Sequence, residues 1–97
     1  MEVRIQAIHF EIADRLTDFI NKKAERLARR FPDITVFDTT LKVVKPESAM
    51  NKELIVRESM PSHDDVVATK VADSFEEAVD TAIGAVERQL EKYKEKK

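Results

Sequence analysis

The chain has no cysteine and no tryptophan, and it contains a single glycine among its 97 residues. The lack of cysteine excludes a disulfide framework and thiolate metal sites, and one glycine cannot build a glycine-rich phosphate loop. The two histidines, His9 and His63, match no metal-binding or catalytic spacing. No long apolar run is present, so the sequence predicts neither a signal peptide nor a membrane span. We therefore expect no enzyme active site, no metal and no cofactor, and a cytoplasmic protein.

Charge is abundant but unevenly distributed. Charged residues make up 37% of the chain and hydrophobic residues 42%, with a net charge of −2, as expected of one globular domain over residues 1–97. Residues 22–30 hold five bases against one acid, residues 88–97 hold five bases against two acids, and residues 73–80 hold four acids and no base. The overall charge argues against a general polyanion binder, so any contact with nucleic acid must come from local segregation of charge.

Residues 13–31 carry apolar side chains at three- and four-residue steps, which is typical of an amphipathic helix. Ala13 makes a poor N-cap, and Pro32 should end the helix near Phe31. The opposite face of this helix gathers basic residues, namely Arg15, Lys22, Arg26, Arg29 and Arg30. Periodicity alone leaves two interpretations open: a solvated charged face, or a surface that contacts phosphate groups.

Four segments have the pattern of strands. Val3, Ile5 and Ala7 alternate with polar residues, and residues 34–45 are rich in β-branched side chains. In the latter segment we expect an inward-facing set, namely Phe37, Thr39, Leu41 and Val43. Residues 53–60 and 66–71 predict two further strands whose inward register stays open, because their apolar runs are continuous. Polar turns are expected at residues 46–51 and 61–65.

Ser74 followed by Glu77 predicts a capping box and the start of a second helix that runs towards the chain end. Its apolar face extends to Tyr93, which we interpret as the last core contact. Gly84 in mid-helix costs about 1 kcal/mol relative to alanine and suggests a close approach by something on that face. The acidic start and basic end of this segment suit the helix dipole.

The order β-α-β-β-β-α predicts an α+β fold, a four-stranded mixed sheet with two helices packed on one face. The helical crossover should make the first two strands parallel, and the rest should form an antiparallel meander. Because both helices pack by their apolar stripes, both basic clusters should share one side of the molecule.

Three stretches together resemble the ribosome hibernation promoting factors, the family that includes ribosome-associated inhibitor A. They are EIADRLTDFINKKAERLARRFPDI, LKVVK before Pro46, and VVATKVADSFEEAVDTAIGAVERQLEKYKEK, of which ERQLEKYKEK is the most specific. The resemblance covers nearly the whole chain and is weakest over residues 46–63. It is a resemblance to the short form, which lacks the C-terminal dimerisation domain of the long form.

The resemblance implies a factor that binds 16S rRNA and neighbouring proteins of the small ribosomal subunit in the messenger and tRNA channel. Such a factor inhibits translation when growth slows, as part of a stress response. It further implies a free monomer and a second hibernation factor as a partner when ribosomes pair. The implied rRNA-contacting residues are Lys22, Lys23, Arg26, Arg29, Arg30, Arg88, Lys92, Lys94 and Lys96, with Lys97 extending the patch.

Two alternatives remain open at this point. The chain could be a protein-interaction module that uses its basic helices to bind an acidic protein partner. It could also be a small enzyme that uses His63 and the neighbouring carboxylates of Asp64 and Asp65, although a polar turn has that composition by default.

Overall fold

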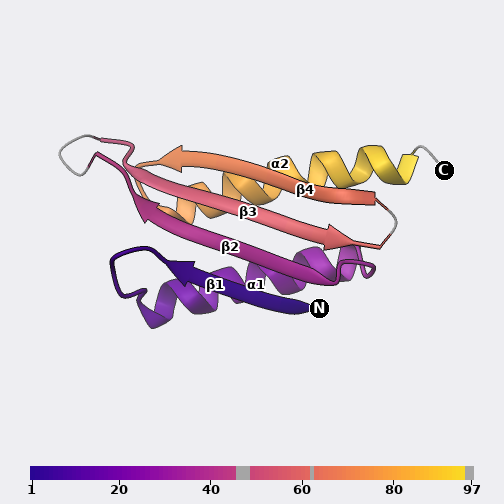
Figure 1. Ribbon diagram of the computed structural model, residues 1–97, viewed down its shortest axis with the longest axis horizontal. Helices are drawn as coiled ribbons and strands as arrows, with labels where there is room; N and C mark the ends of the chain where they lie inside the picture. Colours follow the sequence, from indigo (N-terminus) through magenta and orange to yellow (C-terminus); the bar gives the residue numbers. More distant parts are fainter. Residues whose placement is uncertain (46–48, 62, 96–97) are drawn as a thin grey trace.

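The computed structural model describes residues 1–45, 49–61 and 63–95, with the side chains of residues 63, 94 and 95 outside the described part. Two helices cover one face of a four-stranded sheet (Figure 1). Along the chain the elements are β1 (Glu2–Ala7), α1 (Asp14–Arg30), β2 (Val36–Val43), β3 (Lys52–Met60), β4 (His63–Ala72) and α2 (Phe75–Glu95). The predicted α+β class and the order β-α-β-β-β-α are confirmed.

The sheet follows the chain order β1-β2-β3-β4. β1 pairs in parallel with β2, Glu2 opposite Val36, and α1 supplies the crossover between them. β2 with β3 and β3 with β4 are antiparallel, and the register of the last pair shifts between Glu58 and Met60. The predicted mixed sheet, a parallel pair followed by a meander, is therefore confirmed.

The core lies between the sheet and the two helices. α1 buries Leu16, Ile20, Ala24 and Leu27, the apolar stripe read from the sequence. The sheet contributes alternate residues from each strand because side chains along a strand point to opposite faces. From β2, the expected inward residues Phe37, Thr39 and Leu41 are buried and Val43 is partly buried.

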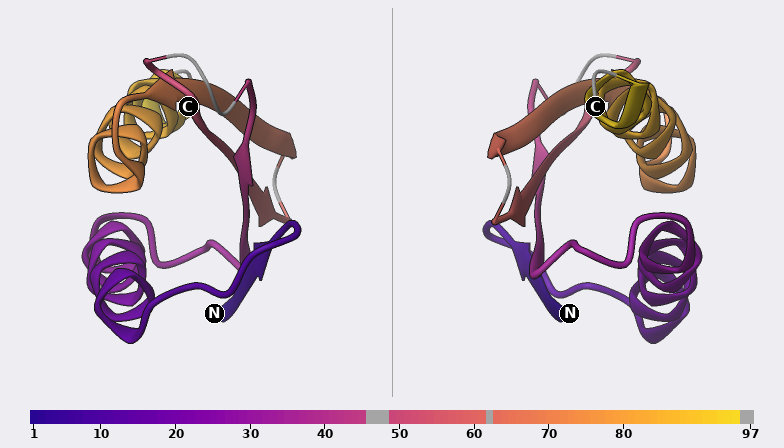
Figure 2. Two further views of the ribbon diagram at one scale, coloured as in Figure 1. Left: turned by 90° about the vertical axis from the view of Figure 1, so that its left-hand side faces the viewer. Right: turned by 90° about the vertical axis from the view of Figure 1, so that its right-hand side faces the viewer.

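The register left open by the sequence is now defined. β3 turns Leu54, Val56 and Glu58 inward, and β4 turns Val66, Ala68 and Ala72 inward. In Figure 2 the molecule is seen along its long axis, and both helices lie side by side on the concave side of the curved sheet.

The helix ends follow the predicted capping chemistry. Ala13 is the N-cap of α1 and makes no side-chain capping hydrogen bond. At α2, the backbone N–H of Glu77 donates to Ser74 Oγ at 3.2 Å, which is the Ser74 half of the predicted capping box.

One strand boundary and one core contact were predicted wrongly. β4 begins at His63, so residues 63–65 of the expected turn belong to the strand, where His63 pairs with Met60. Tyr93 is not a core contact but is 43% exposed, because the last turn of α2 runs past the end of the sheet (Figure 1). Residues 46–48 of the other expected turn lie outside the described residues.

The close approach expected at Gly84 is not made by any part of the described chain. A Cβ atom built on Gly84 would meet no described atom outside its own helix turn within 4 Å, so no part of the described chain requires a glycine there. Gly84 has no positive φ either. The glycine is therefore a local weakness of α2 rather than a packing device.

We predict that Gly84→Ala stabilises the protein by about 1 kcal/mol, because alanine loses less conformational entropy in a helix and meets no clash here. Urea unfolding followed by circular dichroism measures the change. A destabilised variant would show that a neighbour does approach this position.

Candidate functional site

The outer face of α1 carries a row of exposed cations. Lys22, Arg26 and Arg29 follow one another at steps of four and three residues, so they line one side of the helix. All three are exposed, and none forms an ion pair with another described side chain. We call these three residues the α1 basic row.

Two other predicted cations of α1 are held by α2. Lys23 Nζ lies 2.9 Å from Asp80 Oδ1, and this lysine side chain is only 27% exposed. Arg30 bridges two carboxylates one turn apart, with its Nη1 donating to Glu87 at 2.7 Å and its Nη2 to Glu91. Both cations also lie over aromatic rings, Lys23 over Phe19 of α1 and Arg30 over Phe31, the C-cap of α1. These contacts fix both side chains in the seam between the helices.

The carboxylates of that seam form a line on α2. Asp80, Glu87 and Glu91 recur at steps of seven and four residues, so they share the side of α2 that faces α1. We call these three residues the acidic row.

The cations of α2 lie beyond the acidic row. Arg88 and Lys92 each follow an acidic-row residue by one position, which turns them about 100° around the helix and away from α1. Both are exposed and have no ion pair with another described side chain. We call them the α2 basic pair.

The predicted site residues therefore fall into three groups: exposed cations, cations in ion pairs, and cations outside the described residues. Arg26 of α1 and Lys92 of α2 are both exposed, and the two helices that carry them cover the same face of the sheet (Figure 2). The α1 basic row and the α2 basic pair are exposed, whereas Lys23 and Arg30 are engaged by the acidic row. The side chain of Lys94, and Lys96 and Lys97 entirely, lie outside the described residues.

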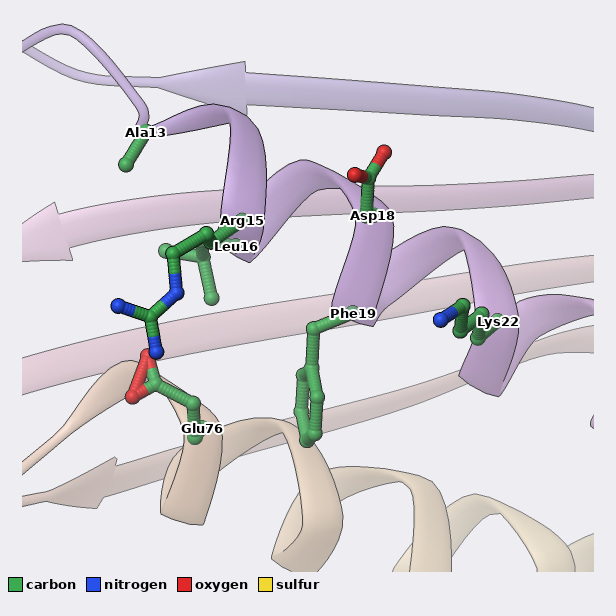
Figure 3. Close-up of a pocket in the computed structure, with 7 residues that line it drawn as sticks. All are labelled: Ala13, Arg15, Leu16, Asp18, Phe19, Lys22 and Glu76. Atoms are coloured by element: carbon green, nitrogen blue, oxygen red, sulfur yellow. The ribbon is translucent and has the colours of Figure 1, made fainter.

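A shallow groove of about 620 Å³ opens between the first turns of the two helices (Figure 3). Phe19 points into it from α1, and the guanidinium of Arg15 points towards the carboxylate of Glu76 on α2. With Lys22 and Asp18 also on its wall, the groove mixes both signs of charge. It is therefore not a phosphate pocket.

The open face of the sheet differs from the helix face. Its charges are interleaved, with Arg4 paired to Glu2 along β1, and Arg57 Nη1 3.4 Å from Asp65 Oδ2 across β3 and β4. Lys42 likewise stands opposite Glu53 in the ladder. Cations and carboxylates alternate on this face, so it offers no continuous surface for a polyanion.

Glu58 is a buried carboxyl that sequence reasoning missed. Its side chain is fully buried in β3, and neither oxygen has a hydrogen-bond partner among the described residues. Burial first, and then the nearby Glu87 carboxylate, together raise its pKa to about 8. Leu54, Val56 and Glu58 follow one another at steps of two residues, so they share the inward face of β3. The sequence did not reveal this register because residues 54–56 are all apolar.

The described part of the chain shows no group of three His, Cys, Asp or Glu side chains placed to hold a metal ion, and His63's side chain lies outside it. Among the described residues, neither helix is long and apolar enough to cross a membrane.

A family model described as Sigma 54 modulation protein / S30EA ribosomal protein matches residues 3–97. The chain is 31% identical over 96 residues to a ribosome hibernation promoting factor of Azotobacter vinelandii, covering 99% of this chain and 85% of the relative. It is 30% identical over 96 residues to a protein of the same name from Pseudomonas putida, covering 99% of this chain and 89% of that relative.

Two solved structures share the fold. A ribosomal subunit interface protein from Coxiella burnetii superposes with a TM-score of 0.85 at 21% identity, covering 97% of this chain and 98% of that one. The N-terminal domain of Thermus thermophilus Protein Y gives a TM-score of 0.79 at 20% identity, covering 96% and 99%.

We predict that Glu58 makes the protein less stable as pH rises. Its folded pKa of about 8 exceeds the ordinary value of 4.5, so the folded state binds more protons between these limits. The stability is fully present below about pH 4.5 and is lost as pH rises through about 8, by up to about 1.4 kcal/mol per pH unit.

Urea unfolding at pH 5, 6, 7 and 8 tests this prediction. Glu58→Gln, which cannot ionise, should flatten the profile, whereas Glu53→Gln on the open face of the same strand should leave it unchanged. Parallel profiles for the native chain and Glu58→Gln would contradict the assignment.

Proposed function

The chain belongs to the Sigma 54 modulation protein / S30EA ribosomal protein family, and from this premise we propose that it is a hibernation factor acting on the small ribosomal subunit. Its described helices would bind 16S rRNA at the messenger and tRNA channel and inhibit translation in slow growth. Residues 1–97 would act as one ribosome-binding domain.

The observation that supports this proposal is the difference in charge pairing between the helix face and the open sheet face. Five of the predicted site cations on the helix face are exposed and have no described ion-pair partner, namely Lys22, Arg26, Arg29, Arg88 and Lys92. The open sheet face pairs or alternates its charges. A surface that binds the RNA backbone needs uncompensated Lys and Arg, so the helix face is the favoured one.

Recognition would depend on phosphate positions more than on base identity. Three of the five phenylalanines, Phe31, Phe37 and Phe75, are buried and cannot stack on bases. Lysine and arginine would neutralise backbone phosphates, and the fixed spacing of two packed helices would select an RNA shape. Folded rRNA offers such a fixed arrangement.

Translation would be inhibited because the protein occupies the messenger and tRNA channel. The body measures 46 Å along its longest axis and 22 by 18 Å across, so it would block messenger and tRNA without any reaction. The family is one of ribosome-associated factors, and we propose no catalytic step for this chain. The proposal places it in the cytoplasm with the ribosomes, as a free monomer that could act beside a second hibernation factor.

We predict that Arg26→Glu combined with Lys92→Glu abolishes co-sedimentation with small subunits. Each charge-assisted contact contributes about 1.5 kcal/mol or more, so the double reversal should weaken binding roughly a hundredfold. The matched control, Arg4→Glu with Lys42→Glu, makes the same charge change on the open sheet face and should still bind. Binding by the helix variant equal to that of the control would refute the site.

Salt dependence provides a separate prediction. Five phosphate contacts at roughly 0.7–0.9 each give a slope of about −3.5 to −4.5 for log affinity against log salt. Fluorescence anisotropy of labelled protein on purified small subunits, from 50 to 200 mM salt at constant magnesium, measures it. A slope near zero would argue for an uncharged interface, and binding that survives RNase in a pull-down would favour the acidic protein partner.

A further inference from the structure

We propose that the acidic row, Asp80, Glu87 and Glu91, determines which RNA the helix face accepts. It would repel RNA whose phosphates cross the seam between the helices, and admit RNA whose phosphates lie on either side of it. This inference rests on the proposed rRNA binding and adds to it a group of residues that discriminates against other polyanions.

Among the side chains that the structure describes, the seam carries more negative than positive charge. Three carboxylates of the acidic row face two cations, Lys23 and Arg30. Arg30 is paired with two carboxylates, so its charge is already compensated within the protein. A phosphate placed over the seam would therefore meet a net negative charge, and like charges in contact oppose binding.

The flanks of the seam are positive. The α1 basic row lies on one side and the α2 basic pair on the other, all exposed. Across the two helices the surface thus alternates from positive to negative to positive. A flexible single strand laid across both helices must place phosphates over the negative seam, whereas a folded RNA can present two backbone segments to the flanks.

Stability does not account for the acidic row. Both partners of each seam contact are partly exposed, and exposed ion pairs contribute little to folding. The packing of the helices is already supported by fully buried apolar residues such as Ala24, Leu27 and Val79. With a net charge of −2, the chain also has no long-range attraction for polyanions, so discrimination must come from local contacts.

The test compares two variants with the same net charge. Glu87→Gln with Glu91→Gln removes two carboxylates from the seam and leaves Arg30 without a charged partner. Glu2→Gln with Glu53→Gln removes two carboxylates from the open sheet face instead. Both variants raise the net charge from −2 to 0. Anisotropy with labelled poly(U) and with purified small subunits, at 50 and 150 mM salt, measures both affinities for each protein.

We expect the seam variant to bind poly(U) about tenfold more tightly than the sheet-face variant. Its salt slope should steepen by about 0.7, because Arg30 becomes available to one more phosphate. Its affinity for small subunits should change less than threefold, so the preference for small subunits over poly(U) falls. Equal poly(U) affinities for the two variants would overturn the proposal.

Two further measurements keep the outcome unambiguous. If the seam variant melts at a clearly lower temperature, the single variant Glu91→Gln replaces it. The Glu91 side chain is 45% exposed. We expect this single variant to show about half of the effect on log affinity. If the native chain fails to bind small subunits, the proposed function fails, but the poly(U) comparison still decides whether the acidic row repels phosphate.

Discussion

Burial of two apolar helix stripes against one face of the sheet is the constraint on which the rest of the structure depends. Ile20 and Leu27 of α1, and Val79 and Val86 of α2, lose nearly all contact with solvent in the same core. Because each stripe faces the sheet, every other side of each helix is left for solvent or for the neighbouring helix. The placement of the helix charges that the structure describes follows from this one packing arrangement.

The two helices use their remaining sides differently. Where they face each other, acids of α2 meet bases of α1, so Lys23 and Arg30 compensate charge within the protein. Where they face outward, Arg26 and Lys92 remain exposed. A protein with a net negative charge can thus hold a locally positive surface, and this segregation is consistent with membership of a ribosome-associated family.

Local periodicity was sufficient to predict the helices, the strand order and the packing of both helices on one sheet face. It failed where tertiary pairing overrides local composition: residues 63–65 look like a polar turn, yet their pairing with β3 extends β4. Tyr93 fits the apolar stripe of α2, but it is 43% exposed, and the last turn of α2 runs past the end of the sheet (Figure 1). The ion pairs of Arg30 join residues 57 and 61 positions apart, a relation that no sequence period contains.

The orientation of the chain on the ribosome is the central claim, and tethered hydroxyl-radical probing tests it most directly. The chain has no cysteine, so Glu25→Cys on the exposed side of α1 and Lys42→Cys on the open sheet face each give a single attachment point for an iron chelate. The account predicts strong cleavage of 16S rRNA from residue 25 and weak cleavage from residue 42. Stronger cleavage from residue 42 would contradict it.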